Sequence, residues 1–371
     1  MLAGFAPLAL WAGAILALPP LGAWLAGQPL GQHLQVPLSA RPFDPLPFSV
    51  PVFWASAALA AGLILCVLWL ASPRRASRPA PSPATPAPSV TRLPAWGWAG
   101  WLGIGLAAAL PELGLVLPLL GLILLVNGHS QRRTGSSLLT RRPGFVAVML
   151  PAGMLLGWLY HWLNLHLQLW HYPDAGAPLP FVLLRSLEYA LLLPAVLSLR
   201  QWLARSPSLL GITNRGRPIG EGAAATGLGW ALLGLAGIGL AGATVWPDWI
   251  YPLTWTAPLL LAIGLGIIAG RPSAFAGVRD GDWSRVLLPA GAALLLGVTL
   301  QLWGSLFGTP WTLTLPLLDG ARVLGLPAIA YLGFLPLGLL AIWLADQLAR
   351  PWRRRPLQRF PKFPVKVVIK S

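Results

Sequence analysis

The sequence predicts an all-α protein, a polytopic bundle of transmembrane helices, and composition is the first reason. Of its 371 residues, 56% are hydrophobic and only 10% are charged, whereas an ordinary soluble domain has about 25% charged residues. The second reason is that the apolar stretches are long, and 52–70 and 223–245 contain no charged residue. In lipid, backbone polar groups are satisfied within helices or closed barrels. Uninterrupted stretches favour helices over barrel strands, which alternate in polarity over about ten residues.

About ten stretches are candidates to cross a hydrocarbon core of about 30 Å. In the first, Pro19-Pro20 interrupts the apolar run and no positive charge precedes it, so we predict a retained, kinked span rather than a cleaved signal peptide. In the third and fourth, Pro111-Glu112 divides 94–127 into two short pieces, which predicts either two short spans or a re-entrant hairpin. The predicted spans are 5–27, 50–72, 94–109, 112–127, 144–163, 181–199, 223–245, 253–270, 286–305 and 325–347.

The basic residues predict the orientation of these spans. All but three of the 26 lysines and arginines fall in the segments 74–92, 132–142, 200–217, 271–285 and 350–370, and the exceptions are Arg41, Arg185 and Arg322. Lysine and arginine are retained on the cytoplasmic side of short loops. We therefore expect both termini in the cytoplasm and the protein in the inner (plasma) membrane. Topology accounts for the net charge of +16, so no nucleic-acid partner is predicted.

Composition divides the chain into four segments. Two predicted helices occupy 1–72, a Pro/Ala-rich linker occupies 73–93, the main bundle occupies 94–349, and a basic tail occupies 350–371. Basic clusters next to a membrane bind anionic headgroups, so membrane lipids are the expected partners, with other membrane-protein subunits as the alternative.

An internal repeat of a helical hairpin is predicted at 144–202 and 286–347. Each copy opens with Pro-Ala-Gly, at 151–153 and 289–291, and its outer loop carries Trp170 or Trp311. The second helix of each copy then holds a tyrosine five residues before a proline. These landmarks are Tyr189 with Pro194 and Tyr331 with Pro336.

The second copy contains Trp311, Pro316 and then Gly-Leu-Pro-Ala-Ile-Ala-Tyr-Leu-Gly-Phe-Leu-Pro at 325–336. This pattern resembles a motif of functionally uncharacterised bacterial multi-spanning membrane proteins, in which Trp and Pro precede Gly-Tyr-Leu-Gly-Phe-x-Pro. Ala330 stands where that motif has its first glycine. The resemblance implies a bacterial membrane protein, and it implies no reaction and no catalytic residue.

Ionisable residues within spans are costly and therefore informative. Arg185 and Glu188 lie three residues apart in one copy of the repeat, and Asp319 and Arg322 lie three apart in the other. This spacing places both members of a pair on one helix face, and Asp319 is expected in a first helical turn. The pairs are either locally neutralised anchors or a polar ligand site. Glu112 is either a turn residue or a further carboxylate of that site.

Aromatic and imidazole side chains gather near the predicted outer ends of spans. His161, His166 and His171 recur at intervals of five with Asp174 nearby, but this spacing does not align them on one helix face, so no metal or other cofactor is predicted. The tryptophans indicate an interfacial aromatic belt, or else a stacking platform for an apolar ligand. They are Trp158, Trp162, Trp170, Trp246, Trp249, Trp255, Trp303 and Trp311.

Three functions remain open from the sequence. The first is binding or translocation of an apolar or amphipathic ligand near the outer leaflet, and the second is modification of a lipid or isoprenoid. The third is a scaffold role in a membrane complex. Few acidic groups lie within spans, which disfavours an enzyme, and no catalytic residue is assigned. The predicted ligand-binding residues are Arg185, Glu188, Asp319, Arg322, Glu112, Trp170, Trp311, Tyr189 and Tyr331.

Overall fold

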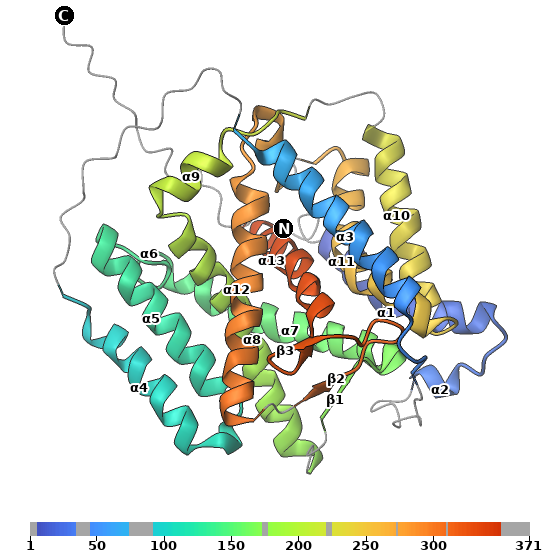
Figure 1. Ribbon diagram of the computed structural model, residues 1–371, viewed down its shortest axis with the longest axis horizontal. Helices are drawn as coiled ribbons and strands as arrows, with labels where there is room; N and C mark the ends of the chain where they lie inside the picture. The colour runs from blue at the N-terminus through green and yellow to red at the C-terminus, as the bar shows by residue number, and fades with distance from the viewer. Residues whose placement is uncertain are drawn as a thin grey trace, which may run out of the picture.

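The computed structural model describes residues 6–34, 45–73, 92–172, 177–219, 225–271, 274–308 and 311–349, and within them the protein is almost entirely helical (Figure 1). Most of the predicted linker and the whole predicted tail lie outside these ranges. The longer helices are α1 (Ala6–Leu25), α3 (Val50–Ala71), α4 (Ala95–Ala109), α5 (Val116–Thr134), α7 (Pro143–Leu167), α8 (Pro178–Leu203), α10 (Ala225–Gly242), α11 (Pro247–Ile268), α12 (Ser284–Phe307) and α13 (Phe334–Ala349).

Short elements connect these helices. Three are α-helical: α2 (Gly31–Leu34), α6 (Leu138–Arg141) and α9 (Pro207–Thr213). Three are 3-10 helices: η2 (Pro111–Leu113), η3 (Ala276–Asp280) and η4 (Ala328–Gly333). Four two-residue strands complete the set: β1 (Trp170–His171), β2 (Thr312–Leu313), β3 (Arg322–Val323) and β4 (Leu326–Pro327).

Among the described residues, seven helices are long and apolar enough to cross a membrane. They are α1, α3, α7, α8, α11, α12 and the continuous stretch Ala328–Ala349 formed by η4 and α13. A helix also lies at each of the three remaining predicted spans, but α4 and α10 are shorter and α5 ends in basic residues. The prediction of a helical membrane bundle is therefore supported at the level of seven candidate spans.

Prolines begin several helices and also occur inside helices of the predicted repeat. Pro143, Pro178 and Pro247 each begin a helix, where the missing N–H costs nothing and the fixed φ suits the first turn. Pro151 and Pro194 lie inside α7 and α8. Such interior prolines are common in transmembrane helices because neighbouring groups satisfy the freed carbonyls.

Consecutive helices form hairpins, and α8 lies at their centre. The pairs α4–α5, α7–α8, α10–α11 and α12–α13 pack along their lengths, and α8 also contacts α5, α12 and α13. The end of α8 that leads into α9 is fully enclosed, with Leu193 through Arg200 buried. The core therefore lies where α8 meets α5, α7, α12 and α13.

Two-residue strands tie the loops of the repeat-bearing hairpins together. Strand β1 follows α7 and pairs antiparallel with β2, which follows α12, so that Trp170 faces Leu313 and His171 faces Thr312. In Figure 1 these strands lie at the lower end, as does the turn between α4 and α5.

The two hairpins of the predicted repeat differ in their second helix. Helix α8 is continuous from Pro178 to Leu203, whereas the second copy passes through β3, β4 and η4 before α13 begins. Tyr189 consequently lies inside an α-helix and Tyr331 inside a 3-10 helix. The expectation that Asp319 lies in a helical turn is wrong, because Asp319 belongs to the irregular loop between β2 and β3. The repeat itself stays a prediction.

Candidate functional site

The Arg185–Glu188 pair lies on α8, within the bundle, and its two side chains are 5% and 4% exposed. Both occupy the same face of the helix because they are three residues apart, and the guanidinium Nη1 contacts the carboxylate Oε2. The other carboxylate oxygen, Oε1, accepts a hydrogen bond of 2.8 Å from the backbone N–H of Leu115. The carboxylate charge is therefore balanced by the Arg185 cation, and its other oxygen is satisfied by a backbone donor.

Aromatic side chains enclose the Arg185 guanidinium. Its central carbon lies 5.0 Å from the ring centroid of Tyr172 and 5.9 Å from that of Phe181, distances at which a cation is attracted to the ring face. The Tyr172 and Tyr189 hydroxyls are 3.0 Å apart. Burial raises the pKa of the Tyr172 phenol above its ordinary value. Loop residue Tyr172 thus closes the site over α8.

The turn between η2 and α5 covers the other side of the pair. Gly114 has φ +54°, and a Cβ at this position would clash with Glu188 Oε1. Only glycine therefore lets the backbone approach the carboxylate this closely. The next residue, Leu115, donates its N–H to Glu188 while its side chain is buried. Both Gly114 and Leu115 of this turn therefore contact the Glu188 carboxylate.

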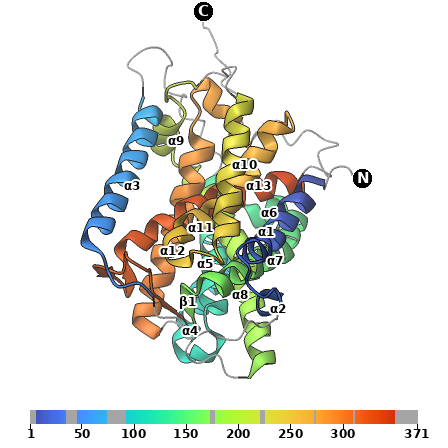
Figure 2. The ribbon, with the colours of Figure 1, turned by 90° about the vertical axis from the view of Figure 1, so that its right-hand side faces the viewer.

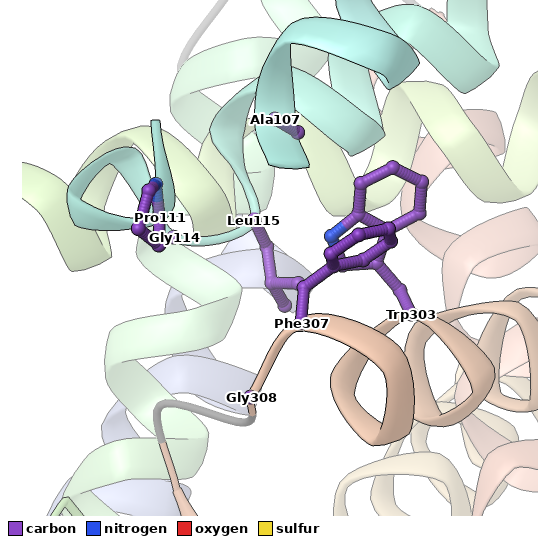
Figure 3. A pocket seen from close by; sticks show the side chains of 7 residues that line it. All are labelled: Ala107, Pro111, Gly114, Leu115, Trp303, Phe307 and Gly308. Carbon is purple, nitrogen blue, oxygen red and sulfur yellow. The ribbon is translucent and has the colours of Figure 1, made fainter. Parts of the chain in front are cut away.

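A crevice of about 190 Å³ opens on the far side of that turn (Figure 3). Gly114 and Leu115 line it, together with Ala107 of α4 and with Trp303 and Phe307 of α12. The Trp303 and Phe307 ring centroids are 4.8 Å apart, and Figure 3 shows both rings opposite Leu115 and Ala107. The side chains that line the crevice are apolar or aromatic, and the Gly114–Leu115 backbone lies between it and Glu188.

The predicted site residues fall into separate groups. Glu112 lies in η2, two residues before Gly114, and is exposed. Asp319 of the β2–β3 loop and Arg322 of β3 form an ion pair of 2.7 Å, with side chains 23% and 42% exposed. The same Arg322 donates to the Gly325 carbonyl, and Tyr331 donates to the Val323 carbonyl. This second ion pair therefore stabilises the β3–β4 hairpin through Arg322.

The remaining predicted residues stabilise the loops. The backbone of Trp170 exchanges two hydrogen bonds with the Asn164 side chain, and its ring packs edge-on against Trp255 at 5.6 Å. Trp311 is half-buried just before β2 and packs against the main hydrophobic core. Exposed tryptophans do occur nearby, since Trp246 and Trp249 are both exposed, as an interfacial belt requires.

The three histidines occupy different surroundings. His161 lies beside Trp158, Tyr172 and Phe181, whereas the His166 ring packs on Trp162 and His33. His171 shares a hydrogen bond of 2.7 Å with the Thr312 hydroxyl. Asp174 lies outside the described residues. Within the described part of the chain, no group of three or more His, Cys, Asp or Glu side chains could hold a metal ion.

Sequence reasoning singled out Arg185 and Glu188 but missed the groups that complete the site. Gly114, Leu115 and Phe307 carried no charge or motif that marked them. A signal did exist at Gly114, because glycine immediately after a proline-containing break between helices often has positive φ. That Glu188 pairs with this turn depends on contacts between residues 73 positions apart. No protein-family model, curated protein or solved structure matches this chain.

Proposed function

We propose that this protein binds an apolar or amphipathic ligand in the crevice between the α4–α5 turn and α12. The observation that carries the proposal is the shared wall, in which Leu115 lines the crevice with its side chain and bonds Glu188 through its backbone N–H. An apolar moiety would pack against Trp303 and Phe307. Ligand sites in proteins are typically concave and mostly apolar, with few polar groups, and this crevice has that character.

The proposal includes ten crossings, obtained by adding α4, α5 and α10 to the seven candidate spans. Both termini would then be cytoplasmic, and the α4–α5 turn, Trp303 and the crevice would lie near the outer leaflet. Retention of basic loops in the cytoplasm supports this orientation. The ligand would therefore enter from the outer half of the bilayer.

Binding is favoured over catalysis by the state of Glu188. An acid or base must reach the proton that it transfers, whereas both oxygens of this carboxylate are engaged, one by Arg185 and the other by Leu115. The Gly114–Leu115 backbone also stands between the carboxylate and the crevice. The ion pair accordingly acts as a support for the crevice wall.

Filling the crevice tests the proposal. Ala107 lines the crevice, while its neighbour Ala108 is exposed, so Ala107→Phe and Ala108→Phe are a matched pair. A diazirine-bearing palmitic acid would be photolysed with the purified protein, and the labelled peptides identified by mass spectrometry. We expect label in 107–115 or 303–308, reduced about tenfold or more by Ala107→Phe, equivalent to about 1.4 kcal/mol of lost contact. Unchanged labelling of Ala107→Phe in these peptides would refute the proposal.

A further inference from the structure

Helix α3 is attached to the rest of the protein at its two ends. At one end, the Ser49 N–H donates to Leu317 and the Leu317 N–H donates to Leu46, at 3.0 and 3.1 Å. At the other, the Arg217 N–H donates to the Leu70 carbonyl at 2.6 Å. Between these ends, no α3 side chain before Ala71 is buried, and Figure 2 shows α3 along the edge of the molecule. The middle of α3 therefore stands away from the bundle.

An open groove of about 290 Å³ separates the middle of α3 from η4. Phe53, Ala57, Ala61 and Ile64 line the side formed by α3, and Ile329 and Leu332 line the opposite side. Every one of these side chains is apolar. In a bilayer such a groove is filled by hydrocarbon, because water would find no hydrogen-bond partner there.

The end of α3 that leads into the basic loops carries positive charge. The Arg217 guanidinium lies 3.8 Å from the ring centroid of Trp69, a side chain suited to the headgroup level. Arg217 Nε and Arg215 Nη2 are enclosed and have no hydrogen-bond partner among the described residues. Leaving a buried donor without a hydrogen bond costs free energy. An anionic group beside the Arg217 guanidinium would satisfy its Nε donor, and Arg215, two residues earlier in the chain, adds positive charge to the same loop.

We propose that an anionic glycerophospholipid binds along α3, with its phosphate at Arg215 and Arg217 and one acyl chain in the groove. The geometry suits a chain from one leaflet, which spans about half of a 30 Å core, or roughly 15 Å. A distance of roughly 15 Å from Leu70 along α3, at 1.5 Å per residue, reaches the level of Ala60. The chain therefore extends past Ile64 and Ala61, which line the groove.

A partner transmembrane helix fits the groove less well than a single acyl chain does. Packed helices lie about 8–10 Å apart axis to axis, so a helix inserted between α3 and η4 would require the two to separate. The hydrogen bonds at both ends of α3 oppose that separation. A flexible chain needs no such movement. This lipid site is independent of the crevice at Trp303, since the two share no lining residue.

Native mass spectrometry can test the lipid site on the full-length protein. The protein would be incubated with phosphatidylglycerol or with phosphatidylcholine, and the retained lipid measured after detergent exchange. We expect one phosphatidylglycerol retained about tenfold better than phosphatidylcholine. Ala61→Trp fills the groove and should abolish retention, whereas Ala58→Trp, on the exposed face of the same helix, should not. The double variant Arg215→Gln/Arg217→Gln should remove the preference for phosphatidylglycerol, and Arg142→Gln on an exposed loop should preserve it.

Three outcomes would overturn the lipid site. One is equal retention of the two lipids by the unmodified protein, and another is full retention of phosphatidylglycerol by Ala61→Trp. The third is a dimer that Ala61→Trp dissociates, which would make a second copy of the chain the occupant of the groove. Loss of folding in Ala61→Trp is checked by its thermal unfolding against Ala58→Trp, and the arginine double variant tests the headgroup without altering the groove.

Discussion

At the scale of single residues, two ion pairs of the same chemistry and spacing have different roles. Arg185–Glu188 is enclosed within the bundle, whereas Asp319–Arg322 lies on an exposed loop. Exposed pairs contribute little because water screens them. Removing one member of a buried pair leaves an uncompensated charge in a medium of low dielectric constant. Burial, rather than residue type, therefore decides which pair the structure depends on.

Removing each acidic partner in turn tests this difference. Glu188→Ala leaves Arg185 buried without its anion and should lower the free energy of unfolding by about 3–5 kcal/mol. Asp319→Ala, the matched control, should lower it by about 0–1 kcal/mol. Reversible unfolding in detergent micelles, followed by circular dichroism, measures both. Equal losses for the two variants would mean that burial does not decide which of the two pairs the structure depends on.

At the scale of elements, glycines set the distance between α4 and α5. A Cβ at Gly100 would come within 2.7 Å of the Gly121 carbonyl oxygen, and one at Gly128 within 2.8 Å of the Gly97 Cα. The two backbones therefore touch, as small residues allow in membrane helix pairs. This hairpin carries the turn that covers Glu188, so its packing positions the crevice wall.

A leucine placed at this contact should separate the hairpin. Gly100→Leu should destabilise the protein by about 1–3 kcal/mol, the usual cost of overpacking. Gly105→Leu is the control, because a Cβ at Gly105 meets no other atom within 4 Å. Thermal unfolding compares the two variants. A Gly105→Leu variant as unstable as Gly100→Leu would indicate that the loss does not come from the close approach of the two helices, because leucine is the better helix former of the two residues.

At the scale of the whole molecule, the distribution of charge predicts how the bundle is inserted. The basic loops contain α6, α9 and η3. Helices α7 and α12 begin at basic loops, and the strands β1 and β2 lie at their opposite ends (Figure 1). Retention of positive loops predicts that α6, α9 and η3 lie on the cytoplasmic side. Cys66 is the one cysteine of the chain and is exposed, so a cysteine-free background is simple to make.

Single cysteines added to a Cys66→Ser background test this orientation. Thr312→Cys, on exposed strand β2, should react with a membrane-impermeant maleimide in intact cells. Ser208→Cys, at an exposed position of α9, should react only after the cells are permeabilised. The reason is that arginine-rich short loops, such as the one containing α9, are retained on the cytoplasmic side of the membrane. Labelling of Ser208→Cys in intact cells would reverse the assigned orientation.

The helices were predictable from the sequence, because hydrocarbon accepts only elements that satisfy their own backbone and apolar stretches of sufficient length form helices there. Each predicted span contains a helix, and seven reach the length and apolarity of a span. That Arg185 and Glu188 pair with each other was also predictable, since charge within an apolar stretch needs a partner. The expected helical position of Asp319 was wrong, because proximity in sequence to a span does not extend the helix through Gly320 and Pro327.

The sequence by itself determined that the apolar stretches suit a lipid bilayer, where the helices lie along the chain, and which side of the membrane the basic loops favour. These properties depend on local composition, which acts on each stretch separately. Only the tertiary structure decided that the α4–α5 turn covers Glu188, that Trp303 and Phe307 form a crevice against Leu115, and that α3 leaves a groove beside η4. Those contacts join residues far apart in the chain, and in lipid they depend on shape and hydrogen bonding between helices that are apolar on nearly every face.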